Sequence, residues 1–349
     1  MDLLTISDLK RAAQNGRAEG RVHAQVETIV RKETRDLKPF WELTLADALA
    51  KMTLRAWSDS PNYPICAELA NGAFLEIAGE FTFSTNYGLD SKKWTLRALD
   101  DAERDALLAG TPALRDRQAA DFEFIAQSVA GIADPRLRAL GEAFLRDFGD
   151  KFRRAAAARN NHHARRGGLV EHTAQMMRAA EAICGVYTKL NRDLMLAGVL
   201  FHDCGKLWEN GMPEAGFAME ADARGELLGH IAIGVELVNT IWRKLLATEE
   251  AKAWATLQPP SDDVRMHLLH LIVAHHGELQ FGSPAVPKTP EAQALHYIDN
   301  LDAKMEMFAA GYEKAAQVAP GIYEKTWPLP GNLIAPLPPF SQPSGQQSE

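Results

Sequence analysis

Histidines are concentrated in one part of this sequence, and several stand near aspartates. Eleven histidines occur among the 349 residues, and ten of them lie between residues 162 and 296. The pair His202-Asp203 lies near the end of segment 193–207, which is apolar nearly all round and predicts a buried helix. A buried carboxylate is costly unless it is paired or bound to a metal. The dipeptide is therefore either a self-satisfied His–Asp pair or part of a metal site.

Other predicted helices offer further candidate ligands. Each is a histidine or an aspartate that lies within or at the end of a helical segment: His172, His230, His275, His276 and Asp299. Neutral imidazole and carboxylate are ligands for manganese, iron, cobalt and zinc. The number of these side chains suits two ions that share a carboxylate, and such a pair can stabilise both the attacking and the leaving oxygen of a phosphoryl transfer.

The order H…HD…H…HH…D resembles the HD-domain metal-dependent phosphohydrolase superfamily. Five segments are more narrowly similar, and in the same order, to the YhaM-type 3′→5′ exoribonucleases. These segments are NHHARRGGLVEHT (161–173), LAGVLFHDCGKLWE (196–209), GELLGHIAIG (225–234), IVAHHGELQFGSP (272–284) and EAQALHYIDNLDAKM (291–305). The HD dipeptide alone is a weak signal, whereas the five segments in order are highly specific. The resemblance covers roughly residues 155–310 closely.

The resemblance implies a role for each matching residue. One ion would be held by His172, His202, Asp203 and Asp299. Asp203 would bridge to a second ion, whose site His230, His275 and His276 would complete. Two divalent ions are expected, manganese first, with iron, cobalt, zinc and magnesium as alternatives.

Catalysis and substrate binding would use other side chains of the same segments. Lys206, together with Asp203, would be catalytic and would neutralise charge at the scissile phosphate. The resemblance places four residues against substrate: His162, His163, Arg165 and Arg166. The alternative for the two histidines is an ordinary helix terminus. Asp302 is a rival for the metal role of Asp299, or it orients a neighbouring side chain.

The first hundred residues alternate with period two, which predicts strands. Three strands, a helix and two more strands are expected, at 21–32, 39–46, 51–58, 61–69, 73–83 and 92–99. This is the element order of a five-stranded OB-type β-barrel, a fold that binds single-stranded nucleic acid. Trp57 and Tyr87 are the predicted stacking platforms. The alternative is that most of the aromatic rings fill the barrel core.

The pattern of strands followed by helices predicts an α+β multidomain chain, and the resemblance implies that the helical part after the barrel is an all-α HD domain. The expected division is an OB domain at 1–105, a helical connector at 106–158, the HD domain at 159–320 and a Pro-rich tail without fixed structure at 321–349.

Composition limits the partners and the compartment. The net charge of −8 argues mildly against nucleic acid, although residues 151–170 carry six Lys or Arg and no acid. That basic run is either a solvated helix end or a substrate contact. No apolar stretch reaches membrane-spanning length, and no signal peptide is recognised. Three scattered cysteines fit a reducing compartment, so a cytoplasmic location is expected.

The resemblance implies 3′→5′ exonucleolytic hydrolysis of single-stranded RNA to nucleoside 5′-monophosphates, with single-stranded DNA as a further candidate substrate. One alternative is an HD phosphohydrolase that acts on a small nucleotide, a deoxynucleoside triphosphate or a cyclic nucleotide, with a regulatory OB domain. Another is a nucleic-acid-binding protein with an inactive HD scaffold. A homo-oligomer is left open.

Overall fold

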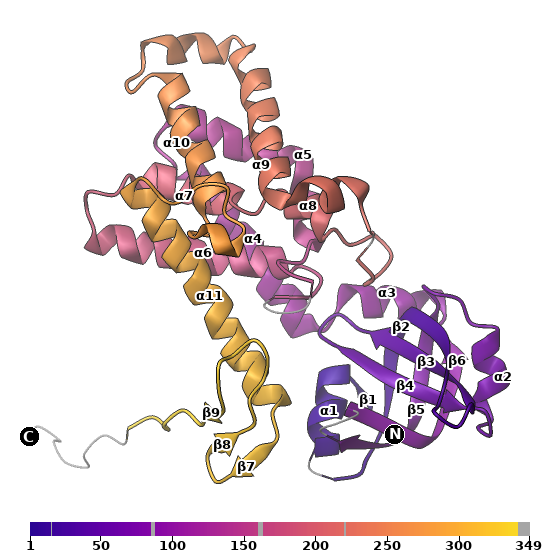
Figure 1. Cartoon of the computed structure of the whole chain (residues 1–349). Helices are drawn as coiled ribbons and strands as arrows, with labels where there is room; N and C mark the ends of the chain where they lie inside the picture. Colours follow the sequence, from indigo (N-terminus) through magenta and orange to yellow (C-terminus); the bar gives the residue numbers. More distant parts are fainter. Residues whose placement is uncertain (15, 85–87, 160–162, 220, 341–349) are drawn as a thin grey trace, which may run out of the picture. The chain divides into compact units, whose positions relative to one another are not determined.

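A computed structural model of the chain describes residues 1–14, 16–84, 88–159, 163–219 and 221–340. The chain forms two compact units, Met1–Lys304 and Met305–Glu349. In the first unit a sheet region precedes a helical region, which confirms the α+β prediction (Figure 1). Two of the predicted substrate-binding residues, Tyr87 and His162, lie outside the described residues.

The sheet region has the strand order expected of an OB fold. Its elements are β2 (Ala18–Glu33), β3 (Pro39–Ala46), β4 (Lys51–Trp57), α2 (Asn62–Ala67), β5 (Phe74–Ser84) and β6 (Gly88–Ala98). The strands lie side by side in the order β4-β3-β2-β5-β6, and each of these pairs is antiparallel. The first half of β2 pairs with β5 and its second half with β3, so this long strand joins the two halves of the sheet.

Alternation along β2 places every second side chain in the sheet core. Val22, Ala24 and Val26 have no solvent exposure. Two elements absent from the sequence prediction precede β2. They are β1 (Leu3–Leu4), which pairs in parallel with β2, and α1 (Ile6–Gln14), whose apolar side chains are buried in the same core.

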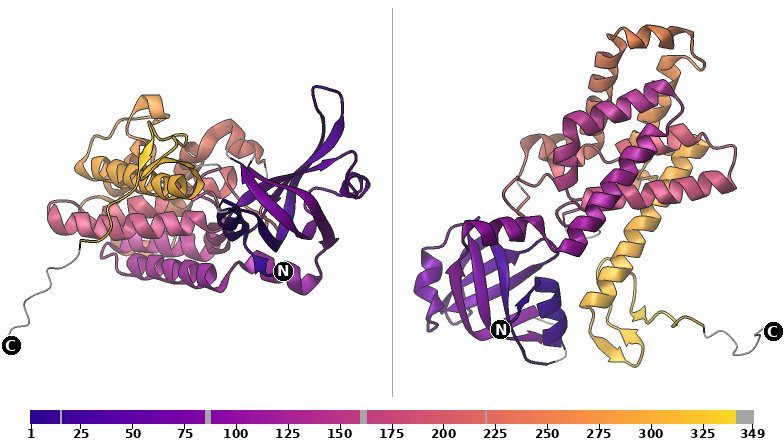
Figure 2. Two further views of the ribbon diagram at one scale, coloured as in Figure 1. Left: turned by 90° about the horizontal axis from the view of Figure 1, so that it is seen from below. Right: turned by 180° about the vertical axis from the view of Figure 1, so that it is seen from behind.

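The helical region forms a second core. Its helices are α3 (Asp101–Ala109), α4 (Pro112–Ala130), α5 (Pro135–Arg154), α6 (Gly168–Val186), α7 (Arg192–Phe201), α8 (Lys206–Glu209), α9 (Ala223–Leu246), α10 (Ser261–Ala274) and α11 (Pro290–Lys314). Phe144, Phe201 and Trp242 are among its largest buried side chains. Helices α4 and α5, expected as a connector, lie against the other helices of this region (Figure 2). They contribute Ile125 and Leu140 to the same core.

The apolar segment 193–207 is not one continuous helix. Helix α7 ends at Phe201, and a turn leads into α8, which begins at Lys206. A Cβ atom on Gly205 would lie 1.9 Å from the carbonyl oxygen of His230. The turn and the glycine therefore allow a close backbone approach between the start of α8 and α9.

The second unit contains the end of α11 and three short strands. These are β7 (Gln317–Ala319), β8 (Ile322–Tyr323) and β9 (Leu333–Ile334), which form a sheet in the order β7-β8-β9. The sequence predicted a tail without fixed structure from residue 321 onward. In the described part of this segment, Leu329 and Leu333 are buried and two strands form, so the structure differs from that expectation.

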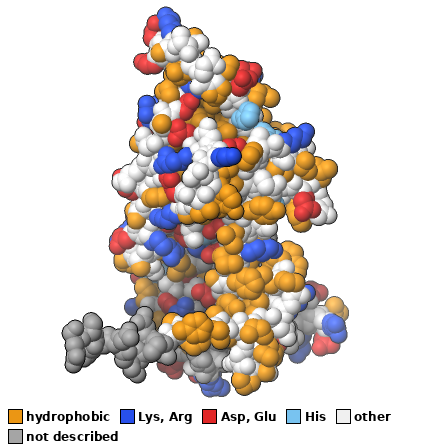
Figure 3. Space-filling model, turned by 90° about the vertical axis from the view of Figure 1, so that its left-hand side faces the viewer, with side chains coloured by type: hydrophobic (Ala, Val, Ile, Leu, Met, Phe, Trp, Pro, Cys, Tyr) orange, Lys and Arg blue, Asp and Glu red, His pale blue; other side chains and the backbone are white. Residues whose placement is uncertain are grey.

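On the face drawn in Figure 3, basic and acidic side chains are interspersed with apolar ones. Among the described helices, none has a segment with the length and hydropathy needed to span a bilayer.

Candidate metal centre

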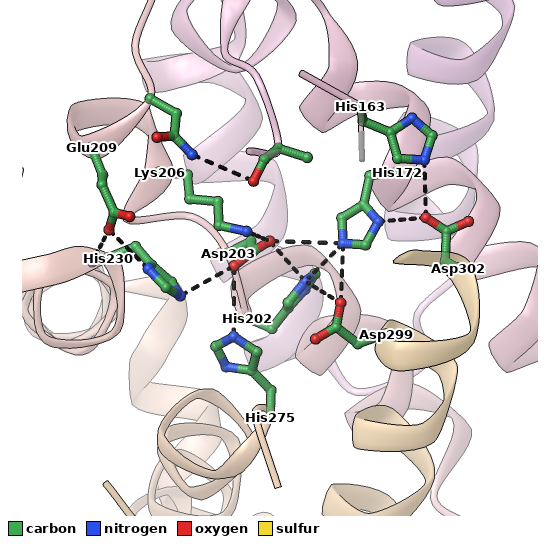
Figure 4. A network of polar contacts seen from close by, with 12 residues as sticks. His163, His172, His202, Asp203, Lys206, Glu209, His230, His275, Asp299 and Asp302 are labelled. Atoms are coloured by element: carbon green, nitrogen blue, oxygen red, sulfur yellow. Dashed lines mark hydrogen bonds and ion pairs between the residues drawn. The ribbon is translucent and has the colours of Figure 1, made fainter. Parts of the chain in front are cut away.

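Two of the predicted ligands stand immediately after helices that end at the site. His202 follows α7 and His275 follows α10. The Nδ1 atom of His202 donates to the carbonyl of Val199 at 2.8 Å, and that of His275 donates to the carbonyl of Ile272 at 2.7 Å. Carbonyls in a last helical turn lack intrahelical donors. The helix ends therefore hold both rings and leave each Nε2 with its lone pair (Figure 4).

Three more histidines are held by the same atom. The Nδ1 atom of His172, on α6, lies 2.6 Å from Asp302 Oδ2. The Nδ1 atom of His230, on α9, lies 2.8 Å from Glu209 Oε2, and that of His276 lies 2.9 Å from a backbone carbonyl. A partner on one ring nitrogen fixes the tautomer and the orientation of a metal-ligating imidazole. All five rings therefore offer Nε2 as the ligand atom.

Four side chains form an inner cluster, in which His172, His202 and Asp203 are buried and Asp299 is partly buried. His172 Nε2 lies 3.3 Å from His202 Nε2 and 3.4 Å from Asp299 Oδ1. His202 Nε2 lies 3.2 Å from Asp203 Oδ2. Ligand atoms about 2.1 Å from one ion lie roughly 3–4 Å apart. The inner cluster has this spacing.

An outer cluster lies on the other side of Asp203. The Oδ1 atom of Asp203 lies 3.5 Å from His230 Nε2 and 3.6 Å from His275 Nε2. Ligand atoms of His230, His275 and His276 all lie within 4.8 Å of one another. His230 and His276 are only partly buried, whereas His172 and His202 have no exposure, so the outer cluster is the more accessible to solvent. Asp203 stands between the two clusters.

Several buried polar atoms of the site have no hydrogen-bond partner, and they indicate which kind of ligand the clusters can bind. Among the described residues, Asp203 Oδ1, His230 Nε2 and His275 Nε2 are buried without a hydrogen-bond partner. Buried polar atoms are rarely left in this state. Three acceptors that converge without a donor between them are suited to a cation. The residues present therefore fit divalent metal ions.

The pKa shifts of the ligand residues also favour a bound cation. Burial lowers the pKa of His275 well below its usual value, so its imidazole is neutral and able to bind a metal at neutral pH. Burial raises the pKa of Asp203, but Lys206 and His202 outweigh it, and the net pKa falls well below its usual value. Although burial opposes it, hydrogen bonds to Asp299 and Asp302 raise the pKa of His172 to about 9. The negative charge of the inner cluster thus favours a positive charge at His172 Nε2, and a metal ion bound there would take the place of the proton on that atom.

Two further side chains border the clusters. Lys206 is almost fully buried, and its Nζ atom lies 2.6 Å from Asp203 Oδ2. Glu209, at the end of α8, accepts bonds from both the backbone N–H and the Nδ1 atom of His230. Helix α9 has a non-helical residue at Gly229, with φ of 68°, and Glu209 thereby caps the helical segment that begins at His230. The sequence prediction missed Glu209; its place one turn after Lys206 was the available signal.

The predicted substrate-binding residues are less accessible than expected. The side chain of His163 has no exposure, and its Nε2 atom lies 3.0 Å from Asp302 Oδ2. Arg165 forms an ion pair with the buried Glu171. Arg166 donates to backbone carbonyls between residues 213 and 216, and burial lowers its pKa to about 10. Trp57 is 38% exposed and packs against the ring of Phe40.

These rings and cations therefore have structural partners within the chain. Among the described members of the predicted set, Trp57 retains a partly exposed aromatic surface. The seven predicted metal ligands, in contrast, are all brought together.

The helical fold and the paired His/Asp clusters are those of an HD-domain protein. The model of the HD domain matches residues 169–304, which include all seven of these side chains. A 3′-5′ exoribonuclease YhaM from Geobacillus sp. is 30% identical over 303 residues, which cover 86% of each chain. The YhaM from Bacillus subtilis is 43% identical over 157 residues, 45% of this chain and 44% of that protein.

The chain belongs to the family of the YhaM 3′-5′ exoribonucleases. Its sheet region also matches a solved structure, the OB domain of Ta0387 from Thermoplasma acidophilum. That match has a TM-score of 0.21 and 14% identity, and it covers 29% of this chain and 89% of that one.

Proposed function

We propose that this protein is a metal-dependent 3′→5′ exonuclease that hydrolyses single-stranded RNA, and single-stranded DNA as a second substrate, to nucleoside 5′-monophosphates. The observation that carries the proposal is the set of buried acceptors around Asp203, which have no donor among the described residues and lie beside the buried cation of Lys206. Relatives that bear the name 3′-5′ exoribonuclease support the direction of cleavage and the choice of RNA.

The residues that would hold the ions fall into two sets that share one carboxylate. His172, His202, Asp203 and Asp299 would hold one ion. Asp203 would also serve the second, with His230, His275 and His276. When bound, two divalent ions would lower the pKa of a water molecule towards neutrality and stabilise charge on the phosphoryl oxygens. Manganese is the first candidate, because mixed imidazole and carboxylate ligands suit it.

The chain's own side chains would prepare the site for this chemistry. The Nδ1 contacts of the histidines keep their Nε2 atoms directed inward, so little reorganisation accompanies the reaction. Lys206 places a positive charge next to Asp203, where it would donate to a phosphoryl oxygen of the substrate and stabilise the charge that develops there.

Two exposed apolar side chains lie close in the chain to ligands of the outer cluster. Leu228, two residues before His230, is 54% exposed, and Phe281, whose carbonyl accepts from His276, is 60% exposed. Aromatic side chains stack on bases of any sequence, with a contribution of roughly 1–3 kcal/mol per base. The 3′ end of a strand would bind here. The sheet region, with Trp57, would hold the 5′-ward part of a single strand.

The test uses RNA, DNA and duplex oligonucleotides that carry a 5′ label, incubated with the full-length protein and Mn²⁺. We expect a ladder that shortens from the 3′ end of the single strands and a much slower reaction with the duplex. A His202→Ala/Asp203→Ala variant should be inactive. A His267→Ala variant is the matched control, because His267 lies exposed on α10 away from both clusters.

Each other outcome identifies a different function. If the single strands stay intact while a deoxynucleoside triphosphate or a cyclic nucleotide is hydrolysed, the site serves a small nucleotide and the exonuclease proposal is wrong. A protein that binds RNA but hydrolyses neither kind of substrate would be a binding protein with an inactive HD scaffold.

A further inference from the structure

Asp302 lies between two histidines, one of which is a predicted metal ligand. Its Oδ2 atom is 2.6 Å from His172 Nδ1 and 3.0 Å from His163 Nε2 (Figure 4). Neither histidine side chain has any solvent exposure. The opposite ring nitrogen of His172 faces Asp299 and His202 in the inner cluster. A continuous polar chain therefore runs from His163 through Asp302 to a ligand atom of the site.

The backbone of His163 is held firmly in an uncommon conformation. Its φ is 47°, in the left-handed region that non-glycine residues rarely adopt. The His163 carbonyl accepts from the N–H of Ala157 at 3.3 Å. A Cβ atom on Gly168 would lie 2.0 Å from this same carbonyl oxygen. The start of α6 is thus packed against His163, and it fixes where the imidazole is placed.

We propose that His163 and Asp302 are positioning residues that orient His172 for metal binding, and that His163 does not contact substrate. This inference rests on the metal site proposed above. Asp302 accepts the Nδ1 proton of His172 and so leaves the lone pair on Nε2 directed at the cluster. A carboxylate in this role also increases the basicity of the ring. His163 donates to the same oxygen and holds the carboxylate in place.

The geometry distinguishes this role from the two alternatives for these residues. A substrate contact needs an accessible ring, whereas the side chain of His163 is fully buried. The geometry favours Asp299 over Asp302 as the metal ligand, because Asp299 Oδ1 lies 3.4 Å from His172 Nε2 and 4.0 Å from His202 Nε2. Asp302 Oδ2 lies instead at hydrogen-bond distance from the Nδ1 atom of His172 and the Nε2 atom of His163. Among the described residues, His172, His202 and Asp203 bring their ligand atoms within 4.8 Å of one another, and Asp302 forms a separate group of this size with His163 and His172.

The test measures the affinity for Mn²⁺ without RNA, from the electron paramagnetic resonance signal of free Mn²⁺ during titration of the full-length protein. Loss of a residue that orients a metal ligand typically weakens metal binding about 10–100-fold. We expect His163→Ala and Asp302→Ala to weaken one of the two Mn²⁺ sites by this factor, while His163→Gln, which retains an N–H donor, recovers part of the loss. His270→Ala is the matched control: its half-buried ring accepts from a backbone N–H outside the clusters, and Mn²⁺ affinity should not change.

Activity then separates positioning from substrate contact. In His163→Ala the kcat at limiting Mn²⁺ should fall and recover with excess Mn²⁺, while the KM for RNA stays unchanged. Unchanged Mn²⁺ affinity together with a raised KM would show that His163 contacts substrate and would overturn the proposal. A lower melting temperature with unchanged Mn²⁺ affinity would overturn it as well.

Further variants separate a failure to fold, or a wrong metal site, from a wrong role for His163. If His163→Ala does not fold, His163→Gln and Asp302→Asn carry the same comparison. Because Mn²⁺ affinity is measured without RNA, this proposal can succeed even if the wild-type protein proves not to be an exonuclease. If Asp203→Ala binds Mn²⁺ as tightly as the wild type, the metal site itself is wrong and this proposal fails with it.

Discussion

Gly205 lies where the turn after His202-Asp203 meets the backbone of His230, and a Gly205→Ala substitution should disturb the outer cluster without altering any ligand. The added Cβ atom would lie 1.9 Å from the His230 carbonyl oxygen and 2.8 Å from its Cα atom. Carbon and carbonyl oxygen normally stay about 3.3 Å apart. The two backbones must therefore separate by about 1.4 Å, since a backbone atom cannot rotate away as a flexible side chain does.

The expected loss follows from that displacement. His230 Nε2 lies 3.5 Å from Asp203 Oδ1, and the shift is large compared with the tolerance of a metal site. A misplacement of about 1 Å can cost roughly 100-fold in rate. Overpacking of this kind also destabilises a fold by about 1–3 kcal/mol. We expect the rate of RNA shortening to fall about 100-fold and the melting temperature to fall with it.

The assay compares this variant with Gly185→Ala. Gly185 lies in the last turn of α6, and a Cβ atom there would meet no heavy atom within 4 Å. Alanine is the better helix former by about 1 kcal/mol in a helix interior, so this control should be as active as the wild type and no less stable. Activity of Gly205→Ala within twofold of the wild type, with an unchanged melting temperature, would falsify the argument that the close approach positions His230.

Three further predictions concern metal, substrate and pH. Mn²⁺ at about 100 times its Kd should raise the free energy of unfolding of the metal-free protein by about 2.7 kcal/mol; a melting temperature that ignores Mn²⁺, or one that responds equally in Asp203→Ala, would contradict the site. Phe281→Ala should raise the KM for RNA about 5- to 150-fold, the equivalent of one stacked base, and leave hydrolysis of bis(p-nitrophenyl) phosphate unchanged; equal losses on both substrates would argue against stacking. Asp134 accepts from the buried guanidinium of Arg136, which outweighs burial and lowers the carboxyl pKa. Its contribution to stability should be complete above the unfolded pKa of about 3.9 and be lost as the pH falls through the lower folded value. Asp134→Ala should lower the free energy of unfolding by about 3 kcal/mol at neutral pH, measured by urea unfolding at a series of pH values. If the loss of stability at low pH is the same in the variant as in the wild type, this assignment is refuted.

Much of the local structure could be predicted from the sequence. Apolar and polar residues alternate with period two in β2 to β6, because one face of each strand must be buried. This alternation predicted the five strands and the position of α2 between β4 and β5. The HD dipeptide was recognised because an aspartate in an apolar helix needs a partner. The seven ligand candidates came from residue type and from a resemblance carried by motif segments, since those segments lie in or beside helices that converge on one site.

Other features depended on the tertiary packing. Asp302 and Asp299 stand on the same helix three residues apart, and the sequence left their roles open between them. Asp299 lies in the inner cluster and Asp302 contacts His163, and this division depends on how α11 packs beside α6. His163 was expected to contact substrate, beside Arg165 and Arg166, but its side chain has no solvent exposure. The contacts that decide these roles join residues far apart in the chain, such as His163 with Asp302 and His230 with Glu209.

The sequence by itself therefore determined which side chains can bind metal and in what kind of elements they lie, because ligand chemistry and helical periodicity are local properties. The tertiary structure alone decided which nitrogen of each ring faces the site. That choice is made by the acceptor next to Nδ1, and these acceptors are helix-end carbonyls such as those of Val199 and Ile272 or distant carboxylates such as Asp302. Only the folded chain brings those acceptors to the rings, and a hydrogen bond requires both atoms within about 3 Å.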